Sequence, residues 1–138
     1  MEDFFNTIYY WTNSLYCEEL DNYLYDTVPG YLHVGLSMLV MSLIVCWLFY
    51  YIAKPVRNQI KTWLLFVVSN AAINMGIALW YTMTPLINNE IDEAESWFYF
   101  DCVGFSISNI IWSFVTFIVV SFIIKWWSPA KFVPFQKF

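Results

Sequence analysis

The chain has 138 residues, which is the size of a single domain. Hydrophobic residues make up 60% of it and charged residues only 12%, which excludes an ordinary water-soluble protein, because such proteins are about 25% charged. The net charge of −5 is unevenly spread, since acidic and basic residues occupy different segments.

Residues 1–29 form an acidic and aromatic segment that precedes the first long apolar stretch. Phe4, Ile8, Trp11 and Leu15 recur at helical spacing and predict an amphipathic helix with one apolar face. This face is expected to lie on a membrane surface, to cap the rest of the protein or to dock a partner. The Pro29–Gly30 pair predicts the end of the segment.

Three stretches contain no charged residue: 30–52, 62–86 and 102–124. A helix of this length reaches roughly 34 Å or more, and the hydrocarbon core of a bilayer is about 30 Å thick. A helix also satisfies every backbone N–H and C=O group inside lipid. The sequence therefore predicts an all-α integral membrane protein with three transmembrane helices.

The segments around these stretches alternate in charge. All eleven acids lie in 1–29 and 87–101, and all six bases lie in the 53–61 loop and the 125–138 tail. Because Lys and Arg near the ends of spans stay in the cytoplasm, the expected topology places the N-terminus outside and the C-terminus inside. Without a signal or transit peptide, a bacterial or viral source is expected, and a bacterial inner membrane is the expected location, with an organelle membrane as the alternative.

The acidic segment between the second and third spans predicts a further short helix on the outer side. Asn88 or Asn89 can cap it, and the acids that follow suit the positive end of a helix dipole. We expect this helix to run into the third span or to kink near Gly104. The aromatic tail after Lys125 is expected to lie along the inner membrane interface.

Uncharged polar residues line one face of the second and third spans. Asn70 and Asn74 are four residues apart, so they share a face. A second stripe in the third span has spacings of 3, 4 and 3 and consists of Ser106, Asn109, Ser113 and Thr116. An amide in hydrocarbon needs a partner, so both stripes should face protein or water. They predict either the lining of a pore or hydrogen bonds between packed helices.

The remaining reactive side chains give no clear site. Cys17 and Cys102 lie on the same expected side, where they can form a disulfide or remain free thiols, and Cys46 is expected to pack inside the first span. His33 is the only histidine, and one chain cannot build a histidine-based metal site from it. We expect no metal, no cofactor and no nucleic-acid partner.

Two functions follow from these patterns. The spans carry no ionisable acid or base, and no catalytic motif appears, so an enzyme is not expected. The first hypothesis is a homo-oligomeric channel or pore-forming effector with an uncharged Asn/Ser/Thr lining. The alternative is a non-catalytic accessory or assembly subunit of a larger membrane complex. The expected partners are the lipid bilayer, further copies of the chain, and a protein bound at the outer helix or the inner face.

Overall fold

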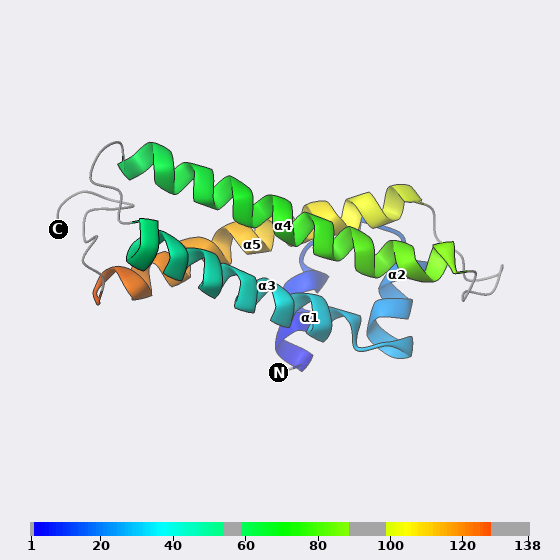
Figure 1. Ribbon diagram of the computed structural model, residues 1–138. Coiled ribbons are helices and arrows are strands. Elements are labelled where there is room, and N and C mark those ends of the chain that lie inside the picture. Colours follow the sequence, from blue (N-terminus) through cyan, green and yellow to red (C-terminus); the bar gives the residue numbers. More distant parts are fainter. Residues whose placement is uncertain (1, 54–58, 89–98, 128–138) are drawn as a thin grey trace.

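The computed structural model describes residues 2–53, 59–88 and 99–127, and within them every regular element is a helix (Figure 1). Four short elements come first: α1 (Glu2–Tyr10), the 3₁₀ turn η1 (Asn13–Leu15), α2 (Glu18–Asn22) and the π-turn η2 (Tyr23–Thr27). The long helices α3 (Gly30–Trp47), α4 (Gln59–Ile87) and α5 (Tyr99–Lys125) follow, and α3 continues as the π-turn η3 (Leu48–Ala53).

Three helical stretches are long and apolar enough to cross a membrane: Gly30–Ala53, Ile60–Ile87 and Tyr99–Lys125. Their mean hydropathies of 2.2, 1.6 and 2.2 reflect the uncharged runs in the sequence. The expected all-α class is therefore confirmed, and it includes three helices that are long and apolar enough to span a membrane. The orientation and the kind of membrane stay predictions.

The three long helices lie side by side, and each contacts the other two (Figure 1). Most of their surface nevertheless faces outward, as expected for helices whose solvent is lipid. The helix α4 is the least covered, because only 22% of its most apolar window is buried, compared with 39% for the first span and 33% for α5.

The elements α1 to η2, which we call the N-terminal cap (residues 2–27), pack against one end of this bundle (Figure 1). The cap inserts Phe5 and Tyr9 between the helices, and both side chains are fully buried. Phe4 and Trp11 are exposed, so the expected apolar face is not the face that packs. Trp11 and Leu15 lie beyond the end of α1 at Tyr10, and within α1 it is Phe5 rather than Phe4 that packs, against Gly35.

Two glycines allow this close docking. A Cβ atom on Gly35 would overlap the ring of Phe5, and one on Gly104 would overlap the carbonyl oxygen of Leu15. The helix α5 passes through Gly104 without a break, from Tyr99 to Lys125, so this residue does not end the helix. Gly104 instead provides the space for η1 to approach the helix backbone.

Parts of the predicted organisation lie outside the described residues. These are most of the basic loop (54–58), the short helix expected after Asn88 (89–98) and the aromatic tail (128–138). The break expected at Pro29–Gly30 is present: Val28 is extended, Pro29 lies at the N-cap, and Gly30 is the first residue of α3.

Candidate functional site

The polar side chains of the spans meet in the interior of the bundle. Those that hydrogen-bond along its centre are fully buried, and we call them the polar column: Ser42 on α3, Asn70 and Asn74 on α4, and Asn109 and Ser113 on α5. Four of these five belong to the two stripes predicted from the sequence. All of them come from one chain, so no second copy is required to bring them together.

The amide of Asn70 joins all three helices. Its Nδ2 donates to the Ser42 hydroxyl oxygen at 3.1 Å and lies 3.5 Å from the Ser113 carbonyl oxygen. Its Oδ1 accepts from Asn74 Nδ2 at 3.2 Å. Each of these contacts satisfies a polar atom that would otherwise be stranded in an apolar interior.

Asn109 links the cap to the spans. Its Oδ1 accepts a hydrogen bond of 2.6 Å from the Tyr9 hydroxyl, and its Nδ2 donates to the Asn74 backbone carbonyl at 2.9 Å. Asn74 Nδ2 donates in turn to the Asn70 carbonyl at 2.9 Å. The Oδ1 atom of Asn74 is the one buried side-chain oxygen or nitrogen of the described residues that has no hydrogen-bond partner.

The other members of the predicted stripe differ in their surroundings. Ser106 and Ser113 are buried and donate to carbonyl oxygens of their own helix, at Cys102 (2.8 Å) and Ile110 (2.9 Å). Thr116 is only half-buried, so the stripe turns away from the interior at its last member.

Several polar contacts were not predicted. The Tyr9 hydroxyl donates a hydrogen bond to Asn109, and the hydroxyls of Ser108 and Thr12 share another. The Ser121 hydroxyl oxygen lies 3.4 Å from both Cys46 Sγ and Trp63 Nε1. Ser121 follows Ser113 by eight residues, so extending the helical spacing would have found it. Tyr9 and Thr12 carried no such signal, because their partners lie about a hundred residues away along the chain.

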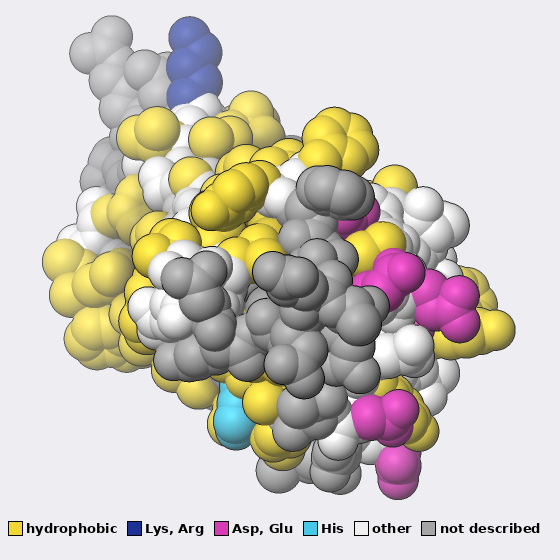
Figure 2. Space-filling view, turned by 90° about the vertical axis from the view of Figure 1, so that its right-hand side faces the viewer, with side chains coloured by type: hydrophobic (Ala, Val, Ile, Leu, Met, Phe, Trp, Pro, Cys, Tyr) yellow, Lys and Arg dark blue, Asp and Glu magenta, His cyan; other side chains and the backbone are white. Residues whose placement is uncertain are grey.

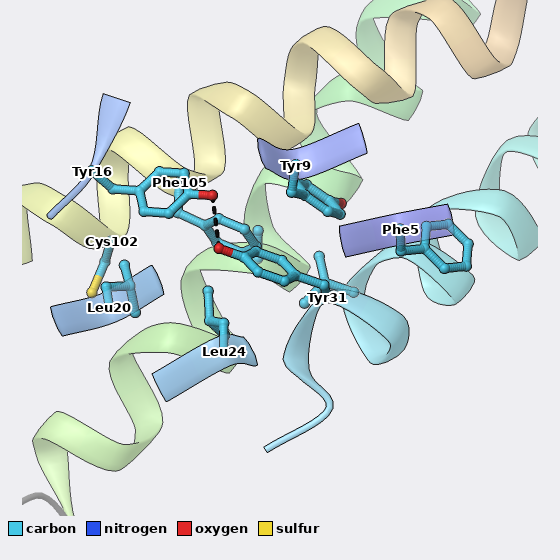
Figure 3. Packing of buried hydrophobic residues seen from close by; sticks show 10 residues of the cluster. Phe5, Tyr9, Tyr16, Leu20, Leu24, Tyr31, Cys102 and Phe105 are labelled. Carbon is cyan, nitrogen blue, oxygen red and sulfur yellow. Dashed lines mark hydrogen bonds between the residues drawn. The ribbon is translucent and has the colours of Figure 1, made fainter. Parts of the chain in front are cut away.

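Aromatic rings from the cap, α3 and α5 pack together in the apolar cluster where the cap meets the bundle (Figure 3). Tyr9 stacks on Tyr31 at 5.1 Å between ring centroids, and Phe105 lies 5.4 Å from both Tyr9 and Tyr16. The Tyr31 hydroxyl is 2.9 Å from that of Tyr16 and donates to the carboxylate of Asp21. Burial raises the pKa of Tyr9 and Tyr16 above the ordinary value, so both hydroxyls stay protonated.

The cysteines and the histidine lie at the edges of this arrangement. Cys17 and Cys102 pack into the same apolar cluster, and a disulfide between them stays a prediction. Cys46 is buried in the first span. His33 is exposed, and its Nδ1 lies 2.9 Å from the Tyr81 hydroxyl. Within residues 2–53, 59–88 and 99–127, no group of His, Cys, Asp and Glu could hold a metal ion.

The polar column contains only neutral amides and hydroxyls. Hydrogen bonds between such groups hold neighbouring helices in register, and each contributes about 0.6 kcal/mol to the stability of a membrane protein. If water enters the interior, the same groups can instead solvate a polar species. Comparisons of the chain with known protein families, curated protein sequences and solved structures give no match, so its function has to be argued from this geometry.

Proposed function

We propose that the chain is a non-catalytic accessory or assembly subunit that works by packing beside other membrane-spanning helices. The observation that supports this most is the internal pairing of the polar column. Asn70, Asn74 and Asn109 direct their amides at one another and at neighbouring helices of the same chain. A pore between several copies would need these groups on an outward face.

The outward faces offer apolar contact area instead. The helix α4 exposes Leu65 and Val68, and one and two turns after Val68 it also exposes the small residues Ala72 and Gly76. Apart from Gly76 itself, its two chain neighbours and the nearby backbone of its own helix, no atom lies within 4 Å of the position that a Cβ on Gly76 would occupy. Small residues four apart let a second helix come close, and this spacing is common at helix–helix contacts in membranes. This face of α4 suits a spanning helix of another protein.

The test combines the mass of the particle with variants of this face. The tagged chain is extracted from its own membrane in mild detergent, and the proteins that copurify with it are quantified. Gly76→Leu and Ala72→Leu should lose the partner, because the larger side chains hold a second helix away. Val115→Leu, which enlarges an exposed residue on α5, should retain it. A monodisperse particle made only of copies of this chain would contradict the proposal.

The channel remains the second candidate, and one feature favours a path through the interior of the chain itself. Asn74 Oδ1 has no partner, although it lies within a continuous series of polar contacts that begins at Tyr9 in the cap. Hydration of this interior would satisfy that atom and open a path for ions. Purified chain in sealed vesicles should then leak ions, and Asn74→Leu or Asn109→Leu should reduce the leak. Vesicles that stay tight would exclude the channel.

A further inference from the structure

A pocket of about 280 Å³ opens between the cap and the last turns of α4. It is lined by Tyr23, the first residue of η2, and by Trp80, Tyr81, Thr84 and Pro85 of α4. Three of its five lining residues are therefore aromatic. The polar column does not include any of them, so the pocket is separate from the candidate site.

The walls of this pocket are held in place. The His33 imidazole lies 2.9 Å from the Tyr81 hydroxyl and meets the ring edge-on, which fixes that ring. The Thr84 hydroxyl donates to the Trp80 carbonyl at 2.6 Å. Pro85 has no N–H group, so it donates no helical hydrogen bond to the Tyr81 carbonyl.

The charge of this end of the molecule favours a cation. Asp21 and Asp26 flank Tyr23 in the sequence, and no Lys or Arg precedes Lys54. Figure 2 looks onto this end of the molecule and shows acidic side chains beside hydrophobic ones. An anionic ligand would meet repulsion here, whereas a cation is attracted both by the acids and by the negative faces of the rings.

The lining also discriminates between kinds of cation. A primary ammonium has three N–H donors that need acceptors, and the side chains of the pocket supply only hydroxyl oxygens besides the rings. A quaternary ammonium has no donor and presents methyl groups, which suit aromatic walls. The Trp80 ring is 72% exposed, so it is free to cover such a group.

We propose that this pocket binds the choline headgroup of a membrane phospholipid, with the quaternary ammonium held against Trp80, Tyr23 and Tyr81. The lipid is the expected source because the pocket lies near the end of a helix long and apolar enough to span a bilayer. Trp and Tyr residues near the ends of spans lie at the level of the headgroups. The inference is independent of whether the chain acts as a subunit or as a channel.

Native mass spectrometry of the detergent-purified chain tests this directly. The chain is incubated with equal amounts of phosphatidylcholine, phosphatidylethanolamine and phosphatidylglycerol that carry identical acyl chains. We expect about five-fold more bound phosphatidylcholine than either of the others, because only it offers a quaternary ammonium to the rings. Tetramethylammonium chloride should displace it, whereas sodium chloride at the same ionic strength should not.

Two variants and a control locate the binding. Trp80→Leu and Tyr23→Leu keep apolar contact but remove a ring face, so each should bring the three lipids close to equal binding. Phe100→Leu changes a ring that is 80% exposed on α5 and does not line the pocket, and it should keep the preference. Equal binding of the three lipids to the unaltered chain would overturn the proposal, as would a preference that survives in both pocket variants.

Discussion

The two ends of the bundle are packed in different ways. The basic-end cluster is built only from the spans and η3: Val45, Cys46, Phe49, Tyr50, Trp63, Val67, Phe117 and Val120. The acidic-end cluster takes half of its members from the cap: Phe5, Tyr9, Tyr16, Leu20, Leu24, Tyr31, Val34, Ala78, Cys102 and Phe105. At one end three helices pack with one another, and at the other a separate segment is inserted between them.

This difference shows where the structure depends on detailed fit. At the acidic end, Gly35 and Gly104 admit the cap with no room for a further atom, and Tyr9 makes a short hydrogen bond to Asn109. At the basic end, the interhelical contacts of Ser121 with Trp63 and Cys46 are 3.4 Å long. We therefore expect a substitution in the acidic-end cluster to release the cap from the bundle. A substitution in the basic-end cluster should loosen the packing of the helices and leave the cap in place.

A pair of phenylalanine truncations on α5 tests this contrast most strongly. Phe105 and Phe117 are both fully buried, one in each cluster, so Phe105→Ala and Phe117→Ala should each lower the free energy of unfolding by about 3 kcal/mol. Only Phe105→Ala should accelerate amide hydrogen exchange in residues 2–22, because Phe105 contacts Tyr9 and Tyr16. Equal exchange in the two variants would mean that the cap is not held by its own cluster.

A glycine pair separates close docking from helix propensity. Gly104→Ala should cost about 3 kcal/mol in denaturant titrations in mixed micelles, because the new methyl group overlaps the Leu15 carbonyl. Gly76→Ala, at a position with open space, should stabilise the chain by about 0.5 kcal/mol through helix propensity alone. Tolerance of Gly104→Ala would mean that η1 approaches α5 less closely than described.

The link between the cap and the polar column is the next test. Asn109→Leu should cost about 2 kcal/mol, because it leaves the Tyr9 hydroxyl and the Asn74 carbonyl buried without their present partner. Thr116→Val on the same helix is the matched control, and it should change the unfolding free energy by less than about 0.5 kcal/mol, since Thr116 is half-buried. Similar costs for the two variants would argue against a special role for Asn109.

The smallest expected effect concerns the thiols. Burial raises the pKa of Cys17 to about 11, an effect that Glu19 and Asp101 reinforce and a backbone hydrogen bond opposes. The ordinary pKa of a cysteine thiol is about 8.5. The contribution of the Cys17 thiol to the free energy of unfolding is therefore present below that pH and is lost as the pH rises towards 11. Peptide mapping after maleimide treatment should show Cys17 alkylation increasing up to about pH 11, with Cys46 unmodified in the folded chain. A plateau near pH 9 would contradict the shift, and a Cys17–Cys102 disulfide would remove both thiols from reaction.

Much of the spanning architecture was readable from the sequence, because the long uncharged runs leave few alternatives. The spacing of Asn70 with Asn74, and of Ser106 with Asn109 and Ser113, also identified residues that the structure buries together. These are local patterns within single helices. Thr116 followed the same spacing without the same burial, because a stripe on a straight helix drifts away from its neighbours.

The docking of the cap could not be read in the same way. Phe4 and Phe5 are adjacent, and helical spacing accommodates either of them on an apolar face. The choice of Phe5 depends on the space at Gly35, which lies thirty residues further along the chain. The role of Gly104 was likewise hidden, because a glycine in a span is compatible with a kink, a helix crossing or, as here, the approach of a distant backbone segment.

The hydrogen bond between Tyr9 and Asn109 has a consequence for biosynthesis. Its two residues are separated by 100 positions in the sequence, and Asn109 belongs to the last helix. A ribosome that adds about 5–20 residues per second needs on the order of 5–20 seconds to travel that distance. During this interval the rings of Tyr9 and Tyr16 lack their contacts with Phe105, and the Tyr9 hydroxyl lacks Asn109. Final closure of the protein therefore has to wait until its third span has been inserted, and a chaperone or the insertion machinery would have to shelter those rings until then.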